Sequence, residues 1–192
     1  FHPKYNLITG DDNSIGKSTL AKLLLWTLGC STHHDPTWKS LDIRALLVFN
    51  VGASEYTVGR YNDIIYIKRP SSSWQKFEKI TGAYSKLFAE IVGFKVLLPN
   101  KKDTTKLETP PPAYYFLPFY IDQESSWTQT WSGFTNLQQY RNWKPTVIKY
   151  HTGYINSEYF KILEEISKNQ FEKKSVEEKV RTIETSINII TE

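Results

Sequence analysis

The stretch from Gly10 to Thr19, Gly-Asp-Asp-Asn-Ser-Ile-Gly-Lys-Ser-Thr, constrains the fold more than any other part of the sequence. It has the spacing of a phosphate-binding P-loop, with Asp11 at the position of the first glycine. The apolar segment 5–9 before it predicts a short strand. The segment after it predicts a helix from Lys17 to Leu28, with Gly29 as its C-terminal cap. A strand, a phosphate loop and a helix in this order predict an α/β fold.

Each residue of this loop has an expected role. Gly16 lets the backbone approach closely, so that amide groups and the helix N-terminus point at a phosphate. Lys17 is expected to reach the β- and γ-phosphates, and the Ser18 hydroxyl is expected to bind Mg²⁺. The carboxylates of Asp11 and Asp12 must point to solvent, because they would repel a triphosphate. The predicted nucleotide-binding residues are Asp12, Asn13, Ser14, Ile15, Gly16, Lys17, Ser18 and Thr19.

Residues beyond the first helix predict a small antiparallel sheet. Three runs of β-type residues separated by turn signals predict a meander over 43–51, 54–60 and 63–69. A further strand is expected near 74–80. An antiparallel subdomain therefore follows the predicted phosphate loop.

The central part of the chain predicts a mixture of elements. A helix is expected over 83–92, capped by Thr81 and ended by Gly93. A loop rich in Lys, Thr and Pro is expected over 99–112. The aromatic, almost uncharged run 114–122 predicts a buried strand. Segment 127–150 is expected to be partly helical, with a break at Pro145.

The last 36 residues, 157–192, contain no Pro and no Gly and predict one continuous helix. A helix of this length spans on the order of 54 Å at about 1.5 Å per residue. We expect it to leave the domain and to pair with a partner helix. Apolar residues spaced alternately four and three apart mark the a/d seam of a coiled coil: Val176, Val180, Ile183, Ile187 and Ile190.

Charge is concentrated in the middle of the chain. The net charge is +4, from 24 Lys and Arg against 20 Asp and Glu. Residues 68–106 hold nine basic and three acidic side chains, a net +6, whereas residues 157–192 hold six basic and eight acidic, a net −2. The basic segment predicts either a solvated face or a contact with a polyanion.

Composition limits the class and the location of the protein. A hydrophobic content of 40% excludes a disordered chain. No apolar run approaches the roughly 18 residues of a membrane span, so we expect no membrane partner. The single cysteine, Cys30, excludes a disulfide framework and favours a reducing, cytoplasmic setting. The sequence contains no Met and starts at Phe1, and we interpret both features as signs of a fragment.

A GTPase is a rival interpretation of the nucleotide site. Asn100-Lys101-Lys102-Asp103 matches the Asn-Lys-x-Asp pattern with which GTPases read guanine. A GTPase also needs Asp-x-x-Gly between the two motifs, and no Asp in this sequence is followed by Gly at the third position. The sequence favours an ATPase and leaves the GTPase as an alternative.

The phosphate loop resembles the Gly-Pro-Asn-Gly-Ser-Gly-Lys-Ser-Thr form of ABC-type ATPases of the SMC (structural maintenance of chromosomes) class. Matching positions are Asn13, Gly16, Lys17, Ser18 and Thr19, and departures are Asp11, Asp12, Ser14 and Ile15. In that class a β subdomain follows, and a later strand ends in a glutamine that approaches Mg²⁺ and the attacking water. The run Phe119-Tyr-Ile-Asp-Gln123 looks like this element. A coiled coil then leaves the head.

This resemblance implies the N-terminal half of an ATPase head, with a lobe over 1–150 and a coiled-coil arm over 151–192. It implies ATP and Mg²⁺ as cofactors, Lys17 and Gln123 as catalytic residues, and Ser18 and Gln123 as metal-binding residues. The second half of such a head supplies acidic residues and a signature that caps ATP across a homodimer. We expect the complete protein to be an ATPase and this chain alone to be inactive.

Four further stretches look like the SMC-like subunit of Lamassu-type bacterial anti-phage systems. The resemblance implies a DNA sensor that controls an effector, commonly a nuclease, together with accessory subunits. The alternatives are a DNA repair or chromosome-maintenance ATPase and a non-catalytic scaffold. The stretches are Leu28-Gly-Cys30, Ile91-Val-Gly-Phe-Lys-Val-Leu-Leu-Pro99, Thr109-Pro-Pro-Pro-Ala-Tyr-Tyr-Phe-Leu-Pro-Phe-Tyr-Ile-Asp-Gln123 and Tyr150-His-Thr-Gly153.

In the family, duplex DNA lies against the β lobe and the roots of the coiled coil. The basic segment 68–106 is the matching part of this chain. Contacts of Lys and Arg with phosphates would give binding that depends on salt and little on sequence. The predicted DNA-binding residues are Lys76, Lys79, Lys101 and Lys102.

Overall fold

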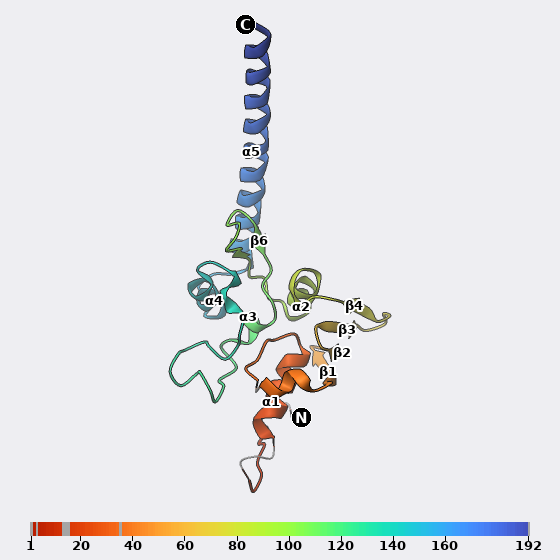
Figure 1. Ribbon diagram of the computed structural model, residues 1–192. Coiled ribbons are helices and arrows are strands. Elements are labelled where there is room, and N and C mark those ends of the chain that lie inside the picture. The colour runs from red at the N-terminus through yellow and green to blue at the C-terminus, as the bar shows by residue number, and fades with distance from the viewer. Residues whose placement is uncertain (1, 3, 13–15, 35, 192) are drawn as a thin grey trace. The chain divides into compact units, whose positions relative to one another are not determined.

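The computed structural model describes residues 2, 4–12, 16–34 and 36–191. The chain is mixed α/β, with antiparallel sheets and a long C-terminal helix (Figure 1). It divides into two compact units, Phe1–Phe94 with Pro110–Leu137 and Lys95–Thr109 with Gln138–Glu192. The predicted division into a lobe and an arm at residue 150 concerns the complete protein and remains a prediction.

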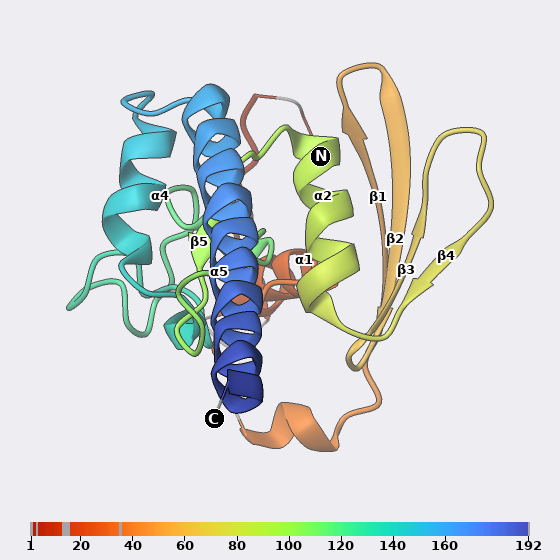
Figure 2. The same cartoon turned by 90° about the horizontal axis from the view of Figure 1, so that it is seen from above.

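The first unit is built on an antiparallel sheet of four strands in the order β1-β2-β3-β4. This confirms the predicted meander and the shorter fourth strand. One face of the sheet packs against the helical elements of the unit, which Figure 2 shows to one side of the strands. The strands are β1 (Arg44–Val51), β2 (Ser54–Tyr61), β3 (Ile64–Lys68) and β4 (Gln75–Phe77). The core residues of this face are Val58, Ile65, Ile67, Tyr84 and Phe88.

Helix α1 (Lys17–Thr27) follows the predicted phosphate loop and is fixed to the sheet at its C-terminal end. Gly29 has a φ of 95° and donates its N–H to the Trp26 carbonyl, while the Cys30 N–H bonds to the Leu25 carbonyl. These two bonds form a Schellman motif, which requires a left-handed residue. The predicted helix and its glycine cap are therefore confirmed.

A buried arginine satisfies the last carbonyls of α1. Arg60 on β2 is 5% exposed, and its guanidinium donates to the carbonyl oxygens of Trp26 and Cys30. The same guanidinium lies 4.3 Å from the centre of the Trp26 ring. The Tyr84 hydroxyl donates to the Leu28 carbonyl at 3.0 Å. A cation and a hydroxyl thus add to the backbone hydrogen bonds at the C-terminal end of α1.

Helix α2 (Ser85–Val92) completes this core, after a π-type turn over Ile80–Tyr84. Gly93 ends α2 in the left-handed region, as predicted. The predicted cap by Thr81 is wrong, because the turn separates Thr81 from the helix and no side chain caps α2.

The predicted strand 5–9 is absent. This segment has no regular structure, and Tyr5 and Leu7 are 87% and 89% exposed. A strand is stable only where a neighbour pairs with its backbone. Among the described residues, no strand pairs with this segment.

The predicted strand 114–122 is also wrong. Its first part is the short helix α3 (Ala113–Phe116), and the rest is irregular. The prolines before it favour a helix start, since proline is accommodated in a first helical turn and has no N–H for a sheet. Burial was predicted correctly only in part: Tyr114 is 1% exposed, and its hydroxyl donates to the Leu137 carbonyl at 2.8 Å, whereas Phe119 and Ile121 are 69% and 80% exposed.

The second unit contains a short hairpin and two helices. Strands β5 (Leu98–Pro99) and β6 (Leu107–Glu108) pair within the region predicted as a loop. Helix α4 (Trp143–His151) includes Pro145, so the predicted break there is wrong. Pro145 is the third helical residue, where its missing N–H would have had no partner. Short 3₁₀ turns lie at Pro36–Ser40 in the first unit and at Leu137–Gln139, where the chain passes from the first unit to the second.

The long helix α5 (Ser157–Thr191) confirms the predicted C-terminal helix. Phe160 is buried at its start, whereas the described residues of the predicted seam are about half exposed. The Ile190 side chain lies outside the described residues. None of the helices in the described part of the chain is long and apolar enough to cross a membrane.

Replacing Gly29 by Ala should destabilise the first unit. A Cβ at Gly29 would lie 2.8 Å from Tyr84 Cε1 in a backbone conformation that disfavours side chains. Strain and overpacking together predict a loss of about 2–4 kcal/mol in the free energy of unfolding, measurable by urea denaturation. Gly93→Ala is the control, because its φ is 70° and no atom lies within 4 Å. Equal losses in the two variants would contradict the packing argument.

Candidate functional site

The N-terminal end of α1 has the geometry of an anion-binding turn. Gly16 adopts a φ of 85°, in the left-handed region, and its carbonyl accepts the Leu20 N–H at 3.0 Å. No side-chain hydrogen bond from the described residues caps this end, and the first turn has no acidic residue. Its amides, near Ser18 and Thr19, are therefore available to an anion. Asn13, Ser14 and Ile15 lie outside the described residues.

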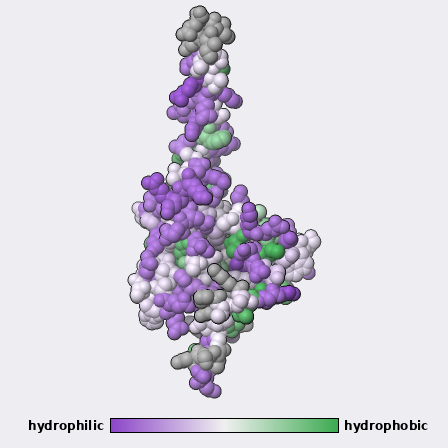
Figure 3. Space-filling view, viewed as in Figure 1, coloured by the Kyte–Doolittle hydropathy of each residue, from purple (hydrophilic) through white to green (hydrophobic). Residues whose placement is uncertain are grey.

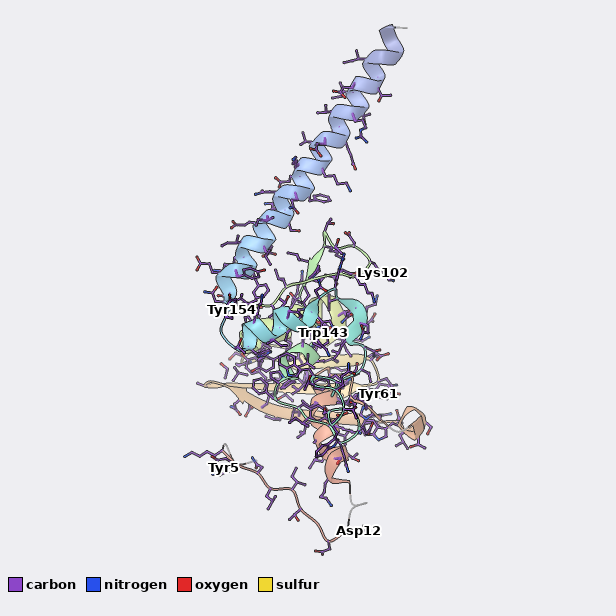
Figure 4. The ribbon with its side chains drawn as sticks, turned by 90° about the vertical axis from the view of Figure 1, so that its left-hand side faces the viewer. Tyr5, Asp12, Tyr61, Lys102, Trp143 and Tyr154 are labelled. Carbon is purple, nitrogen blue, oxygen red and sulfur yellow. The ribbon has the colours of Figure 1, made fainter. Side chains whose placement is uncertain are left out.

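Lys17 bends back over the loop that precedes it. Its ammonium donates to the Asp12 carbonyl at 2.6 Å. A phosphate in this turn would therefore compete with a backbone oxygen for the lysine. The side chains of Asp11 and Asp12 are exposed, and Figure 4 shows Asp12 at the outer end of the loop. This position keeps their charges away from α1, as the motif requires.

Gln123 does not end a strand but lies exposed in a tight turn. The preceding Asp122 is 3% exposed and organises this turn. Its Oδ1 accepts the backbone N–H groups of Ser125 and Ser126 at 3.1 and 2.7 Å. Burial acts to raise the pKa of Asp122, but the hydrogen bonds from Ser126 and Ser125 lower it overall. The carboxylate therefore stays ionised and fixes the backbone on either side of Gln123.

An ion pair joins the Gln123 turn to the phosphate-loop helix. Lys22 Nζ lies 2.5 Å from Glu124 Oε1, and the Lys22 side chain is only 14% exposed. Lys22 follows Ser18 by four residues, so both side chains lie on one face of α1. The turn bearing Gln123 is thereby attached to the helix face that carries Ser18. Sequence analysis missed this pair, because no local pattern connects residues 102 positions apart.

The donor set near α1 is compatible with Mg²⁺ held together with a nucleotide. Ser18 and Gln123 could supply neutral oxygen ligands, and Mg²⁺ commonly completes its shell with substrate phosphates and water. The described residues contain no group of three His, Cys, Asp or Glu able to hold a metal ion by themselves. A metal here would therefore depend on phosphate oxygens.

The side chains behind α1 are structural. Cys30 is fully buried, and burial raises the pKa of its thiol, so it is no nucleophile at neutral pH. His34 stacks on Trp38 with ring centres 3.7 Å apart. Burial first, and then nearby positive charge, lower the pKa of His34 to about 4. His33 and His34 are both half-buried.

The predicted DNA-binding lysines are all exposed but belong to different units. Lys76 on β4 pairs with Glu78 at 3.2 Å, and Lys79 precedes the π-type turn in the first unit. Lys101 and Lys102 lie between β5 and β6 in the second unit, where Figure 4 labels Lys102.

The GTPase-like motif forms the turn of the β5–β6 hairpin. Asn100 Nδ2 donates to Glu108 Oε2 at 3.1 Å, and Asn100 Oδ1 accepts the Lys102 N–H. Asp103 Oδ1 accepts both the N–H and the hydroxyl of Thr105. These contacts give the motif a structural role within the hairpin.

Comparison with known proteins identifies relatives in one group. The chain is 29% identical over 160 residues to "Lamassu protein LmuB" of Bacillus cereus (strain VD014), covering 83% of this chain and 28% of that protein. It is 27% identical over 191 residues to "Lamassu protein LmuB" of Bacillus sp. (strain NCIM 5461 / CCTCC AB 2011126 / NIO-1130), covering 96% of this chain and 32% of that protein.

The chain thus spans about a third of the length of these relatives. No protein-family model matches it, and no solved structure matches it. Over most of its length, the chain is related by sequence to proteins named Lamassu protein LmuB.

Proposed function

We propose that this chain is the nucleotide-binding part of an SMC-like ATPase that acts in a Lamassu-type anti-phage defence complex. The observation that carries the proposal is the uncapped turn at Gly16–Thr19, attached through Lys22 and Glu124 to the turn bearing Gln123. A phosphate-binding turn alone is common. Its connection to a polar turn 102 residues away in sequence is what we expect of an ATPase site.

Each residue then has a role in ATP binding. The amides of the first turn and the Lys17 ammonium would hold the phosphates, once Lys17 leaves the Asp12 carbonyl. Ser18 and Gln123 would hold Mg²⁺, which offsets negative charge on the phosphates when bound. Glu124, paired with Lys22, would hold the turn that carries Gln123 against α1.

We further propose that the complete protein hydrolyses ATP as a homodimer, binds DNA and controls an effector. The sequence relation to Lamassu proteins and the net +6 of residues 68–106 support this proposal. Because the chain spans about a third of its relatives, we expect turnover to need the rest of the protein.

Lys17→Ala should abolish ATP binding. The variant removes the positive charge expected at the phosphates and leaves the fold of α1 intact. Isothermal titration of the complete protein with ATP and Mg²⁺ should show an affinity reduced about 100-fold or more, since two charge-assisted bonds are lost. Lys86→Ala, an exposed change on α2, is the control. Wild-type affinity in the Lys17 variant would refute the site.

Glu124→Gln should slow ATP hydrolysis more than it weakens ATP binding. The change removes one charge of the pair that attaches the Gln123 turn to α1, at a distance from the phosphates. We expect turnover by the complete protein to fall about three- to tenfold, with affinity within about twofold. Restored turnover in Lys22→Glu with Glu124→Lys would show that the pair acts as a unit. Unchanged turnover in Glu124→Gln would exclude the positioning role.

Changing the four candidate lysines to Glu should weaken duplex DNA binding by about tenfold or more and reduce its salt dependence. Because the residues lie in two units, the pairs Lys76 with Lys79 and Lys101 with Lys102 should be changed separately, and then together. Fluorescence anisotropy over a salt series measures the effect. The control is the double variant Lys168→Glu with Lys179→Glu on α5, which changes the net charge by the same amount as each pair. Full binding by the fourfold variant would refute the assignment.

A further inference from the structure

Helix α5 presents two different faces over its first half. One face packs against the rest of the second unit, where Phe160 is 2% exposed and the Ser167 hydroxyl donates to the Thr105 carbonyl at 2.8 Å. The other face carries the predicted a/d seam, and Figure 3 shows hydrophobic residues between hydrophilic ones along this helix. The apolar seam residues are each between 45% and 59% exposed: Ile162, Ile166, Val176, Val180 and Ile183.

Two polar residues interrupt the seam. The spacing of three and four residues places Asn169 and Lys173 at successive seam positions, directly after Ile166. Both side chains are exposed. Lys173 Nζ lies 3.8 Å from Glu177 Oε1 on the same helix, an exposed ion pair that contributes little. A helix that covers the seam removes water from this amide and this ammonium, so it must supply a hydrogen-bond acceptor at the same level.

A second copy of α5 is a poor partner for this seam. Its own seam, from Ile162 to Ile187, contains no Asp or Glu, so it offers Lys173 no seam carboxylate in either orientation. The flanking e and g positions over the same range hold four glutamates and one lysine, so two copies would repel each other along both edges. The charges therefore favour a helix of different sequence, with basic edges and a carboxylate in its seam. The flanking charges are Glu165, Glu172, Glu177, Glu184 and Lys179.

The rest of the same protein is the source that fits this helix. The chain spans about a third of the length of its relatives, so about two thirds of those proteins lie outside the matched region. A helix on the same polypeptide has a high effective concentration at α5, which offsets the cost of covering two polar residues. Contacts of Phe160 and Ser167 fix the start of α5, so the seam faces one side of the unit only.

We propose that Asn169 and Lys173 set the register of a second helix of the same protein, which carries an Asp or Glu at this level of its seam. The carboxylate accepts hydrogen bonds from the Lys173 ammonium and the Asn169 amide, which lie four residues apart on one face of α5. A shift by one heptad would place the carboxylate against Ile166 or Val180 and leave Lys173 buried without a partner. This goes beyond the proposed function, because it depends on neither the nucleotide site nor DNA binding.

Photocrosslinking of the complete protein tests the partner and its register. Benzoylphenylalanine in place of Val176, the seam residue after the polar pair, should crosslink to one peptide of the same polypeptide outside residues 1–192. Mass spectrometry locates this peptide, which should contain an Asp or Glu within about one helical turn of the crosslinked residue. The control places benzoylphenylalanine at Phe171, which is 73% exposed at an f position opposite the seam and should give no such crosslink.

Removing the polar pair should loosen the register and leave the helix pair folded. In Asn169→Leu with Lys173→Leu, the crosslink from Val176 should spread to positions one heptad away, and the wild-type position should lose about half of the product or more. Lys173→Gln should shift the pattern in the same direction and replaces the double variant if circular dichroism shows that the latter is unfolded. Lys173→Arg keeps the cation and should crosslink as wild type. The control is Lys161→Leu with Lys168→Leu, two exposed changes away from the seam.

The outcomes separate this inference from the proposed function. A crosslink between two copies, a crosslink to another subunit, or no crosslink from Val176 would overturn the inference. A single wild-type crosslink position in the folded leucine variant, or in Lys173→Gln in its place, would overturn it as well. Loss of ATP or DNA binding in the wild-type protein bears on the proposed function alone, because the crosslinks report only on α5.

Discussion

The C-terminal end of α1 is the point on which the first unit depends. Arg60 from β2 satisfies the carbonyls of Trp26 and Cys30, and Tyr84 satisfies that of Leu28. A guanidinium buried this deeply must find acceptors, and burial lowers its pKa to about 10 without removing its charge at neutral pH. The helix end supplies these acceptors together with its partial negative charge. Sheet and helix are therefore held in one arrangement.

Fixing this end of α1 also fixes the turn at its other end. Helices are stiff over eleven residues, so the direction in which the amides at Ser18 and Thr19 point follows from the sheet contact. Midway along the helix, Lys22 attaches the turn bearing Gln123. The proposed phosphate contacts and the proposed metal contacts thus share one rigid support. The loop before Gly16 leads directly into α1, and the Lys17 ammonium donates to the Asp12 carbonyl within it.

Local sequence signals predicted those elements that form from their own residues. The meander, α1 with its glycine cap and α5 follow from alternation, helical spacing and a left-handed glycine, each of which operates within a few residues. Predictions were wrong where a strand needs a distant partner strand, or where prolines favour the start of a helix. Segment 5–9 is apolar but has no paired neighbour, and the prolines before Tyr114 begin a helix rather than a strand.

The sequence by itself determined the phosphate-loop spacing, the strands of the meander, the long C-terminal helix and the uneven distribution of charge. Only the tertiary structure decided that Arg60 caps α1 from 34 residues away and that Glu124 pairs with Lys22. The physical reason is separation along the chain. Propensity and periodicity report on neighbours within a turn or a strand, whereas contacts between residues far apart in sequence are settled by which elements pack together.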